Sequence, residues 1–400
     1  MVKVVSLEKG RELVFNSLKQ LQCEEVELAA GLSRVVSSDV VAVIPQPSFD
    51  EAVRDGYVVP SVSVDGGRTR KFKIVGDIPA GRPHGNELLP GTACRIMTGG
   101  CVPKGGERVV PNEKCVELGD ELVVSDHVLQ SSDTYIRKTG SEVAGDGVLV
   151  KRGVRLQPMQ LALLSSSGVR SIAVSTRPCI GFLCTGSELK SPSSILETGQ
   201  KISSNSFLLQ GLSISSGAST EDFGIVADSK ADLLDFFVKV KGGEHDLLVT
   251  TGGMGPGKYD LVRDAFVHAG GQVIFSALDM RPGKSVLFGK LGEILFFGLP
   301  GPPHAVQTLF SILVVPAILA MQGRVGSWPQ KVQAALQHPV KVKRNDILRF
   351  RDGLLILDGG KCLVRFSGKN EMSNCYILLQ SGQTDYTEGE LVEVYLVNGF

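Results

Sequence analysis

Apolar strands and amphipathic helices alternate through the second half of the chain, and this alternation restricts the fold more than any other feature. Residues 179–186 read CIGFLCTG and residues 246–253 read DLLVTTGG, two nearly continuous apolar runs. Segments with the helical spacing of apolar residues lie between and after them, at 204–215, 229–240 and 259–271. Strands that are apolar on both faces need helices on both faces. The pattern predicts a doubly wound, parallel α/β sheet.

The segments that follow extend this unit and argue against a membrane span. Residues 272–278 predict a further strand, residues 285–298 an apolar hairpin and residues 303–321 a helix. The longest apolar run, 309–320, is interrupted by a serine and a proline and falls far below the ~20 residues of a membrane span. The first residues are charged where a signal peptide is apolar. We therefore expect a cytoplasmic protein with no membrane partner.

The first part of the chain has a mixed character. Its spacings predict a short helix over 8–21, a second helix passing into a strand over 25–43, and a helix over 157–166. Between about 45 and 147, β-branched runs alternate with Gly, Pro and Asp turns, as is typical of a β-rich module, with runs at 71–75, 108–110 and 121–124. Helix-like segments on both sides indicate that this module is inserted into one N-terminal unit.

The chain ends in a further β region. Residues after Trp328 form short apolar runs separated by Gly and Asp turns, which predicts an all-β domain of roughly 70 residues. With about 150 residues per domain, a chain of 400 residues has room for two or three domains. We place an N-terminal region at 1–177, the α/β domain at 178–326 and the terminal β domain at 327–400.

Charge and cysteine content exclude several classes of function. The chain has 42 Lys+Arg and 42 Asp+Glu, a formal net charge of zero, which argues against a nucleic-acid partner. The 8 cysteines form no CxxC pair, so zinc and thioredoxin-like sites lack support and reduced thiols are expected. The histidines show no metal-ligand spacing, and His304 is expected to be a first-turn helix residue rather than a catalytic base.

Glycine-containing loops follow several of the predicted strands. Three of them lie at 185–188, 250–260 and 298–303, and a fourth carries two cations, Arg281 and Lys284. Ligands of open parallel sheets bind beyond the carboxyl ends of the strands. Glycines let the backbone N–H groups approach such a ligand, and helix N-termini add partial positive charge. A single loop of this kind is more often structural, but the set predicts an anionic ligand.

A second group of polar residues lies in the N-terminal region. Asp50, Glu51 and Asp55 fall within a turn bounded by proline and glycine. Three carboxylates this close could hold a hard cation such as Mg²⁺. The alternative is a solvated acidic turn in which Arg54 neutralises a neighbour. Arg95, in another turn-bounded segment, is either a salt-bridge partner or a handle for an anion, and both interpretations stay open.

At these same residues the sequence resembles the molybdopterin molybdenumtransferases, bacterial enzymes related to the E domain of gephyrin. The matching motifs run in the order of that family and cover nearly the whole chain. They are Phe49-Asp50 with Asp55-Gly56-Tyr57, GDIPAG at 76–81, GTACRIMTG at 91–99, TGSEL at 185–189, Gly252-Gly253 through Asp260, Pro282-Gly283-Lys284 and GLPG at 298–301.

The resemblance implies a fold and a reaction. The fold is α/β plus β: an elongated multidomain chain with a doubly wound molybdopterin-binding α/β domain, an inserted β-rich module and a C-terminal β-barrel. The reaction is the insertion of molybdate into adenylylated molybdopterin, with Mg²⁺-dependent release of AMP. The implied partners are a second copy of the chain, the small-molecule pterin and oxyanion, and other cofactor-biosynthesis proteins. The cleft of this family joins the α/β domain of one protomer to the N-terminal region of the other.

The resemblance also assigns roles to residues. Asp55, Glu188 and Asp260 would be catalytic and would bind the metal, with Asp55 facing the ligand across the subunit boundary. Twelve residues of the strand-end loops would bind the pterin and the oxyanion: Thr185, Gly186, Ser187, Gly252, Gly253, Gly257, Lys258, Arg281, Pro282, Lys284, Pro300 and Gly301.

The sequence departs from the family at five places. Pro302 stands where the family has Asn, Gly140-Ser141-Glu142-Val143 replaces its G-E-D-I, and three further changes alter the charge of this cleft. Arg54 stands where the family has Met, Ser187 where it has Asp, and Lys258 where it has an acid. These changes add one, one and two formal positive charges, which should weaken a divalent cation and strengthen anion binding. Two hypotheses follow: a working transferase with a rearranged metal site, or an impaired paralogue that carries pterin, molybdate or tungstate. A receptor-anchoring role and a nucleotide amide hydrolase are less well supported by the motifs.

Overall fold

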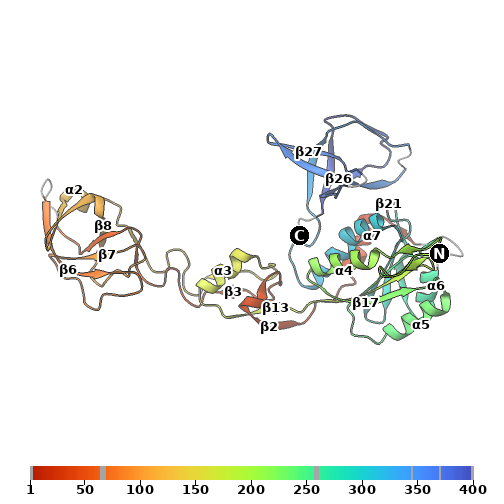
Figure 1. Cartoon of the computed structure of the whole chain (residues 1–400), viewed down its shortest axis with the longest axis horizontal. Coiled ribbons are helices and arrows are strands. Elements are labelled where there is room, and N and C mark those ends of the chain that lie inside the picture. Colours follow the sequence, from red (N-terminus) through yellow and green to blue (C-terminus); the bar gives the residue numbers. More distant parts are fainter. Residues whose placement is uncertain (1–2, 64–68, 256–260, 344–345, 369–370, 398–400) are drawn as a thin grey trace.

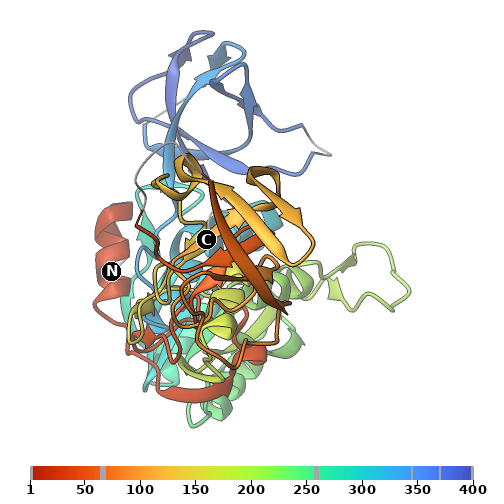
Figure 2. The ribbon, with the colours of Figure 1, turned by 90° about the vertical axis from the view of Figure 1, so that its left-hand side faces the viewer.

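The protein, seen in a computed structural model, is elongated (Figure 1). Residues 3–63, 69–255, 261–343, 346–368 and 371–397 are described. A β module lies at one end, a small linking unit follows, and the α/β domain lies at the other end with the C-terminal β-barrel beside it. The view along the long axis shows the β module in front of the α/β domain and the barrel displaced to one side (Figure 2).

The α/β domain contains the predicted sheet, which has six strands in the order β17-β14-β18-β23-β22-β19. Its strands are β14 (Cys179–Thr185), β17 (Ser219–Val226), β18 (Leu247–Thr251), β19 (Gln272–Phe275), β22 (Leu287–Leu291) and β23 (Ile294–Leu299). Among them only β22, the first strand of the predicted hairpin, runs against the others. The predicted doubly wound α/β fold is therefore confirmed, with one antiparallel strand in the sheet.

Helices cover both faces of this sheet because its strands are apolar on both faces. On one face, α4 (Asn205–Ser215) packs with a long helix made of α7 (Pro303–Leu309), a π-helical turn (Phe310–Val314) and α8 (Val315–Met321). On the other face lie α5 (Lys230–Val240) and α6 (Leu261–His268). Successive residues of β14 point to opposite faces of the sheet: Phe182 packs in the core under α4, α7 and α8, and Leu183 packs in the core under α5 and α6.

The long C-terminal helix of this domain contains the apolar run 309–320 that is too short for a membrane span. By length and composition alone the whole helix Pro303–Met321 could cross a membrane, with a mean hydropathy of 1.8. However, 83% of its most apolar window is buried inside the protein. Its apolar character is explained by its position in the core of the α/β domain, where Phe310 and Ile318 are fully buried.

The N-terminal segment packs on the α/β domain. β1 (Val4–Val5) pairs with β20 (Ala277–Leu278), and α1 (Leu7–Phe15) buries Leu7 and Val14 in the α/β core. The predicted helix over 8–21 thus ends earlier, at Phe15. The boundary proposed at 177 assigns this segment to the N-terminal region, but its contacts belong to the α/β domain.

The linking unit pairs distant segments. β2 (Cys23–Glu27) pairs with β13 (Ser171–Ser175), β3 (Val40–Val41) pairs with β12 (Val148–Val150), and α3 (Pro158–Ser166) packs beside them. The helix predicted within 25–43 was wrong, because only a 3-10 turn, Leu28–Gly31, forms there. Tertiary pairing of Val26 with Ile172 overrides the local helical spacing.

The inserted module is a six-stranded sheet in the order β8-β5-β7-β6-β10-β9. It contains β5 (Gly56–Val59), β6 (Thr69–Ile78), β7 (Thr92–Ile96), β8 (Arg108–Pro111), β9 (Cys115–Leu118), β10 (Glu121–Ser125) and the short α2 (Asp126–Leu129). β4 (Glu51–Ala52) and β11 (Ile136–Arg137) pair where the chain enters and leaves it. The strands predicted at 71–75, 108–110 and 121–124 are all present.

The C-terminal domain is a closed barrel, in which β26 pairs with both β27 and β28. Its strands are β24 (Lys331–Leu336), β26 (Leu348–Asp358), β27 (Lys361–Phe366), β28 (Cys375–Leu379) and β30 (Leu391–Leu396), with β25 (Val340–Lys341) pairing β29 (Asp385–Tyr386) outside it. β21 (Met280–Arg281), from the α/β domain, joins β26 in parallel. The barrel is thereby attached to the α/β domain by a shared sheet edge.

We predict that the aromatic cluster under α5 and α6 is a main source of stability of the α/β domain. Phe296 is fully buried and its ring stacks on Phe266, with centroids 4.4 Å apart and planes at 22°. Phe296→Ala should lower the free energy of unfolding by about 3–5 kcal/mol because it leaves a cavity. Phe207→Ala is the control, since Phe207 is 63% exposed on α4. Equal shifts of the calorimetric unfolding midpoint in both variants would contradict this account.

Candidate functional site

The predicted glycine loops meet at one edge of the α/β sheet. β14, β18 and β23 are neighbours in register, with Cys184 beside Thr251 and Thr251 beside Leu299. The loops after these strands enclose a cavity of about 680 Å³. Seven of the predicted site residues line it: Thr185, Gly186, Glu188, Gly252, Gly253, Pro300 and Gly301.

Gly252 shows why one of these loops requires glycine. Its φ is +93°, in the left-handed region, and a Cβ atom there would lie 2.1 Å from the carbonyl oxygen of Thr185. No side chain fits in that space, so the two strand-end loops approach each other at backbone distance. This close approach gives the cavity a wall made of backbone.

Asp228 also lines the cavity, although it was not predicted from the sequence. It follows β17, and its carboxylate accepts a hydrogen bond from the Thr185 hydroxyl at 2.9 Å. Its backbone N–H donates to the Ser187 hydroxyl at 3.1 Å. Ser187 itself does not line the cavity but holds this turn. The position of this carboxylate just after the apolar end of β17 was the signal that could have identified Asp228.

Asn205 was missed as well. This residue begins α4, is only 7% exposed, and lines the cavity. Its Nδ2 donates to the carbonyl oxygen of Gly301 at 2.8 Å and to the Thr251 hydroxyl at 3.3 Å. Its buried Oδ1 has no hydrogen-bond partner among the described residues. A buried acceptor without a partner is costly, and an N–H donor on a ligand would satisfy it.

The predicted cationic residues lie in an adjacent cavity of about 650 Å³. Arg281, Pro282 and Lys284 line it together with His304, and the two cavities share Ser285 and Pro300. His304 is in the first turn of α7, as expected. The barrel contributes Asp352, whose pKa is raised by burial, an effect that the neighbouring charge of His304 opposes. The ligand-binding edge thus continues from glycine loops to cations.

Asp55 lies elsewhere, in the inserted module between β4 and β5. Its carboxylate accepts hydrogen bonds from the backbone N–H of Thr98 at 2.7 Å and from the Thr98 hydroxyl at 2.8 Å. These bonds stabilise the ionised form and hold the pKa of Asp55 below its ordinary value of 3.8. Within one chain the module lies at the opposite end from α4 and β17 (Figure 1), so one protomer does not bring Asp55 to Glu188.

The acidic turn beside Asp55 forms separate ion pairs and not a joint ligand set. Asp50 accepts from Lys138 Nζ at 2.8 Å and from the backbone N–H of Thr139 at 2.8 Å, while Glu51 lies 3.1 Å from the guanidinium of Arg137. Each carboxylate therefore has its own partner.

Arg95 is a salt-bridge partner, which answers the question that its sequence left open. Its guanidinium binds Glu117 at 2.5 Å and Asp77 at 3.2 Å. Chiefly because of Arg95, the pKa of Glu117 falls to about 2. These side chains remain largely exposed at the surface of the β module.

The carboxylates that line the cavity determine which ligands it could offer to a metal ion. The described residues contain no group of three or more metal-ligating side chains. Glu188 and Asp228 nevertheless line one cavity, and Mg²⁺ is often held by one or two carboxylates together with substrate phosphates and water. The predicted residues Gly257, Lys258 and Asp260 lie outside the described residues.

Comparison with known proteins gives a consistent result. Residues 5–168 match the family described as MoeA N-terminal region (domain I and II), and residues 181–320 match the "Probable molybdopterin binding domain". The chain is 31% identical to the molybdopterin molybdenumtransferase of Bacillus subtilis, over 95% of this chain and 91% of that protein. It is 29% identical to the Haemophilus influenzae protein of the same name, over 98% of both chains.

Solved structures agree with the sequence comparison. The crystal structure of a molybdopterin biosynthesis protein from Pyrococcus horikoshii superposes with a TM-score of 0.81 and 28% identity, covering 100% of both chains. The similarity thus includes the module, the linking unit, the α/β domain and the barrel.

We predict that Gly252 is required for the wall of the cavity. Gly252→Ala should destabilise the protein by more than the about 1–2 kcal/mol expected for a left-handed alanine, because the new Cβ meets the Thr185 carbonyl. Gly199→Ala is a matched control, since Gly199 has a φ of +90° and a Cβ atom there would meet no heavy atom within 4 Å. Thermal unfolding should show a larger shift for Gly252→Ala, and equal shifts would contradict the collision.

We also predict that Thr98 tunes the carboxylate of Asp55. Thr98→Ala removes the side-chain hydrogen bond, so the pKa of Asp55 should rise toward 3.8. Because the folded-state pKa is lowered, this bond stabilises the fold above pH 3.8 and is lost as the pH falls through the lowered pKa. Carboxyl-carbon NMR titration measures the shift. Thr139→Ala, which removes the equivalent bond to Asp50, should leave Asp55 unchanged.

Proposed function

The chain belongs to the molybdopterin molybdenumtransferase family, and from that premise we propose that it inserts molybdate into adenylylated molybdopterin with Mg²⁺-dependent release of AMP. The observation that carries this proposal is the glycine-walled cavity at the carboxyl ends of β14, β18 and β23. The cavity is of the size that small-molecule ligands occupy, and it continues into the cationic cavity of Arg281 and Lys284.

The chemistry of the lining fits such a substrate. Backbone N–H groups at a glycine-rich strand end favour phosphate and oxyanion groups, and Lys284 and Arg281 supply positive charge beside them. The buried, unpartnered Oδ1 of Asn205 accepts a hydrogen bond, which suits a heterocycle that carries N–H groups. The same cavity therefore offers complementary groups to a pterin ring and to its phosphate.

Mg²⁺ would be held by Glu188 and Asp228, together with phosphate oxygens of the substrate. When bound, it would neutralise phosphate charge during the release of AMP. The Thr185 hydroxyl donates a hydrogen bond to one carboxylate oxygen of Asp228 and so fixes the orientation of that carboxylate. Asp228 thereby compensates for the acid that is replaced by Ser187 in this chain. Asp260 stays a predicted third ligand.

The position of Asp55 supports a site shared between two protomers. Its carboxylate is exposed and held ionised by Thr98. It belongs to the β module, which lies at the end of the molecule opposite α4 and β17 (Figure 1). A C2 dimer that places each β module against the partner's α/β domain would bring the Asp55 of each protomer to the cavity of the other. We therefore propose a homodimer that acts in the cytoplasm and exchanges its ligands with other cofactor-biosynthesis proteins.

The second candidate is a carrier that binds pterin, molybdate or tungstate without completing insertion. It is favoured by the positive charge that Arg54, Ser187 and Lys258 add relative to the family. A carrier should bind adenylylated molybdopterin tightly yet release no AMP when molybdate and Mg²⁺ are added. If that is observed, the double variant Ser187→Asp with Lys258→Asp should restore release, since it returns acids to both positions.

We predict that activity requires Asp55 and Lys284 in different subunits. Asp55→Asn and Lys284→Ala should each lower AMP release at least about 100-fold. Co-expressed together, they should recover about a quarter of wild-type activity, because half of the dimers are mixed and each mixed dimer has one intact site. Asp120→Asn, at an exposed turn of the β module, is the control and should stay active. No recovery in the mixed dimers would show that Asp55 does not serve the partner's cavity.

A further inference from the structure

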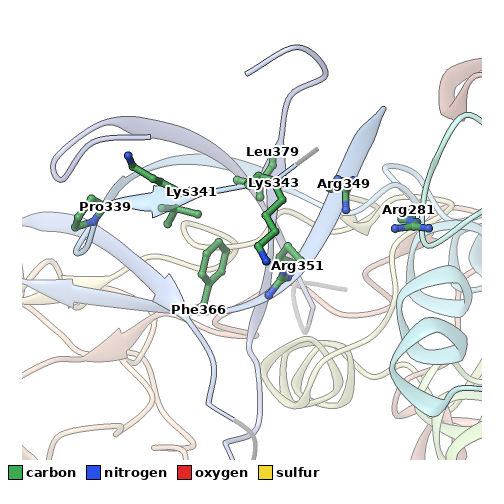
Figure 3. Close-up of a pocket in the computed structure, with 10 residues that line it drawn as sticks. Arg281, Pro339, Lys341, Lys343, Arg349, Arg351, Phe366 and Leu379 are labelled. Carbon is green, nitrogen blue, oxygen red and sulfur yellow. The ribbon is translucent and has the colours of Figure 1, made fainter. Parts of the chain in front are cut away.

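A third cavity, of about 740 Å³, lies on the side of the β-barrel that faces the α/β domain (Figure 3). Five of its lining residues are cationic, and no acidic residue is among the described residues that line it. We call it the barrel groove, defined by Arg281, Lys341, Lys343, Arg349, Arg351 and Phe366. In a chain with a net charge of zero, this is a strong local separation of charge.

Strand pairing places these cations in a row. β21 joins β26 in parallel with Arg281 beside Arg349, so one guanidinium comes from the α/β domain and one from the barrel. Arg349 and Arg351 are two residues apart on β26 and share a face of the strand. Phe350, between them, is 5% exposed and packs in the core near Tyr376 and Tyr395.

The row of cations is only partly neutralised by the protein. Lys341 lies 3.5 Å from Asp385, and Arg349 lies 3.9 Å from Asp346. In the described part of the chain, no carboxylate forms a salt bridge with Arg281, Lys343 or Arg351. Figure 3 shows the side chains of Lys343 and Arg351 reaching toward each other, with Arg349 and Arg281 continuing the row toward the α/β domain. Like charges arranged in this way repel each other unless an anion lies between them.

Phe366 gives the groove an aromatic surface. The guanidinium of Arg351 lies 5.1 Å from the centroid of the Phe366 ring. Aromatic rings and guanidinium planes are the surfaces on which nucleobases stack, and guanidinium forks match the geometry of phosphate. The groove therefore combines groups for a phosphate with a surface for a base.

We propose that the barrel groove binds a phosphate ester, with the phosphate between Lys343 and Arg351 and a planar base against Phe366. The proposal rests on the proposed function for one point, namely that a nucleotide is released at this end of the molecule. The groove shares Arg281, Arg349 and Arg351 with the cationic cavity, whereas Lys341, Lys343 and Phe366 line the groove and not that cavity. The cationic cavity in turn shares Ser285 and Pro300 with the glycine-walled cavity. A nucleotide leaving the catalytic cavity would thus meet the groove along a continuous edge.

Titration calorimetry of the full-length protein with AMP tests this assignment. Lys341→Glu with Lys343→Glu changes only the groove and should weaken AMP binding at least about tenfold, because two attractive charges become repulsive. Lys343→Gln alone, a milder change, should weaken it severalfold and guards against misfolding of the double variant. Lys361→Glu is the control: Lys361 is exposed at the start of β27 and does not line the groove. Binding should also weaken as NaCl is raised.

Competing ligands identify the chemistry that is recognised. Inorganic phosphate should displace AMP weakly, and adenosine should not displace it. Unchanged AMP binding in both groove variants would overturn the proposal, as would adenosine binding as tightly as AMP. Groove variants that lose binding of poly-glutamate but not of AMP would assign the groove to an acidic protein segment instead. Because these measurements use AMP alone, a failure of molybdate-dependent AMP release would leave their outcome unaffected.

Discussion

The backbone contact between the loops after β14 and β18 determines the rest of the functional architecture. Gly252 lies so close to the Thr185 carbonyl that even a methyl group cannot be placed between them. This contact is possible only because parallel strands end at a common edge, where their loops face one another. Asp228, Asn205 and the Gly301 turn then take positions around one cavity.

Those features of the fold that depend on burial could be predicted from the sequence. The strands at 179–185 and 247–251 are covered on both faces, so nearly every residue is apolar and the pattern is evident without a structure. The glycine loops were predictable for a related reason, because a backbone that must approach another backbone leaves little choice of residue. The family motifs then indicated which of those loops belong to one site.

Other features depend on pairing between distant segments and are not apparent in local spacing. The segment after residue 25 has a helical pattern, yet its first residues pair with β13. Asp228 and Asn205 carry only a weak local signature, since a single polar residue after a strand or at a helix start is common. The barrel groove is a stronger case: Arg281 and Arg349 become neighbours only through the pairing of β21 with β26.

The elongated shape of the molecule keeps the carboxylates of the β module apart from the cationic cavities at the other end (Figure 1). Several carboxylates of the β module are bound to nearby cations or hydrogen-bond donors, as Asp50 is to Lys138. The described residues of the module contribute nothing to the three cavities at the other end. Together, the described residues that line those cavities include seven Arg or Lys and three Asp or Glu, so a single protomer attracts anions. Two of these carboxylates, Glu188 and Asp228, line the glycine-walled cavity and are available to a metal ion. If a second protomer supplies Asp55, completion of the metal site becomes conditional on assembly, whereas anion binding does not. Under that arrangement, dissociation of the dimer would abolish turnover and leave affinity for the phosphorylated ligand largely intact.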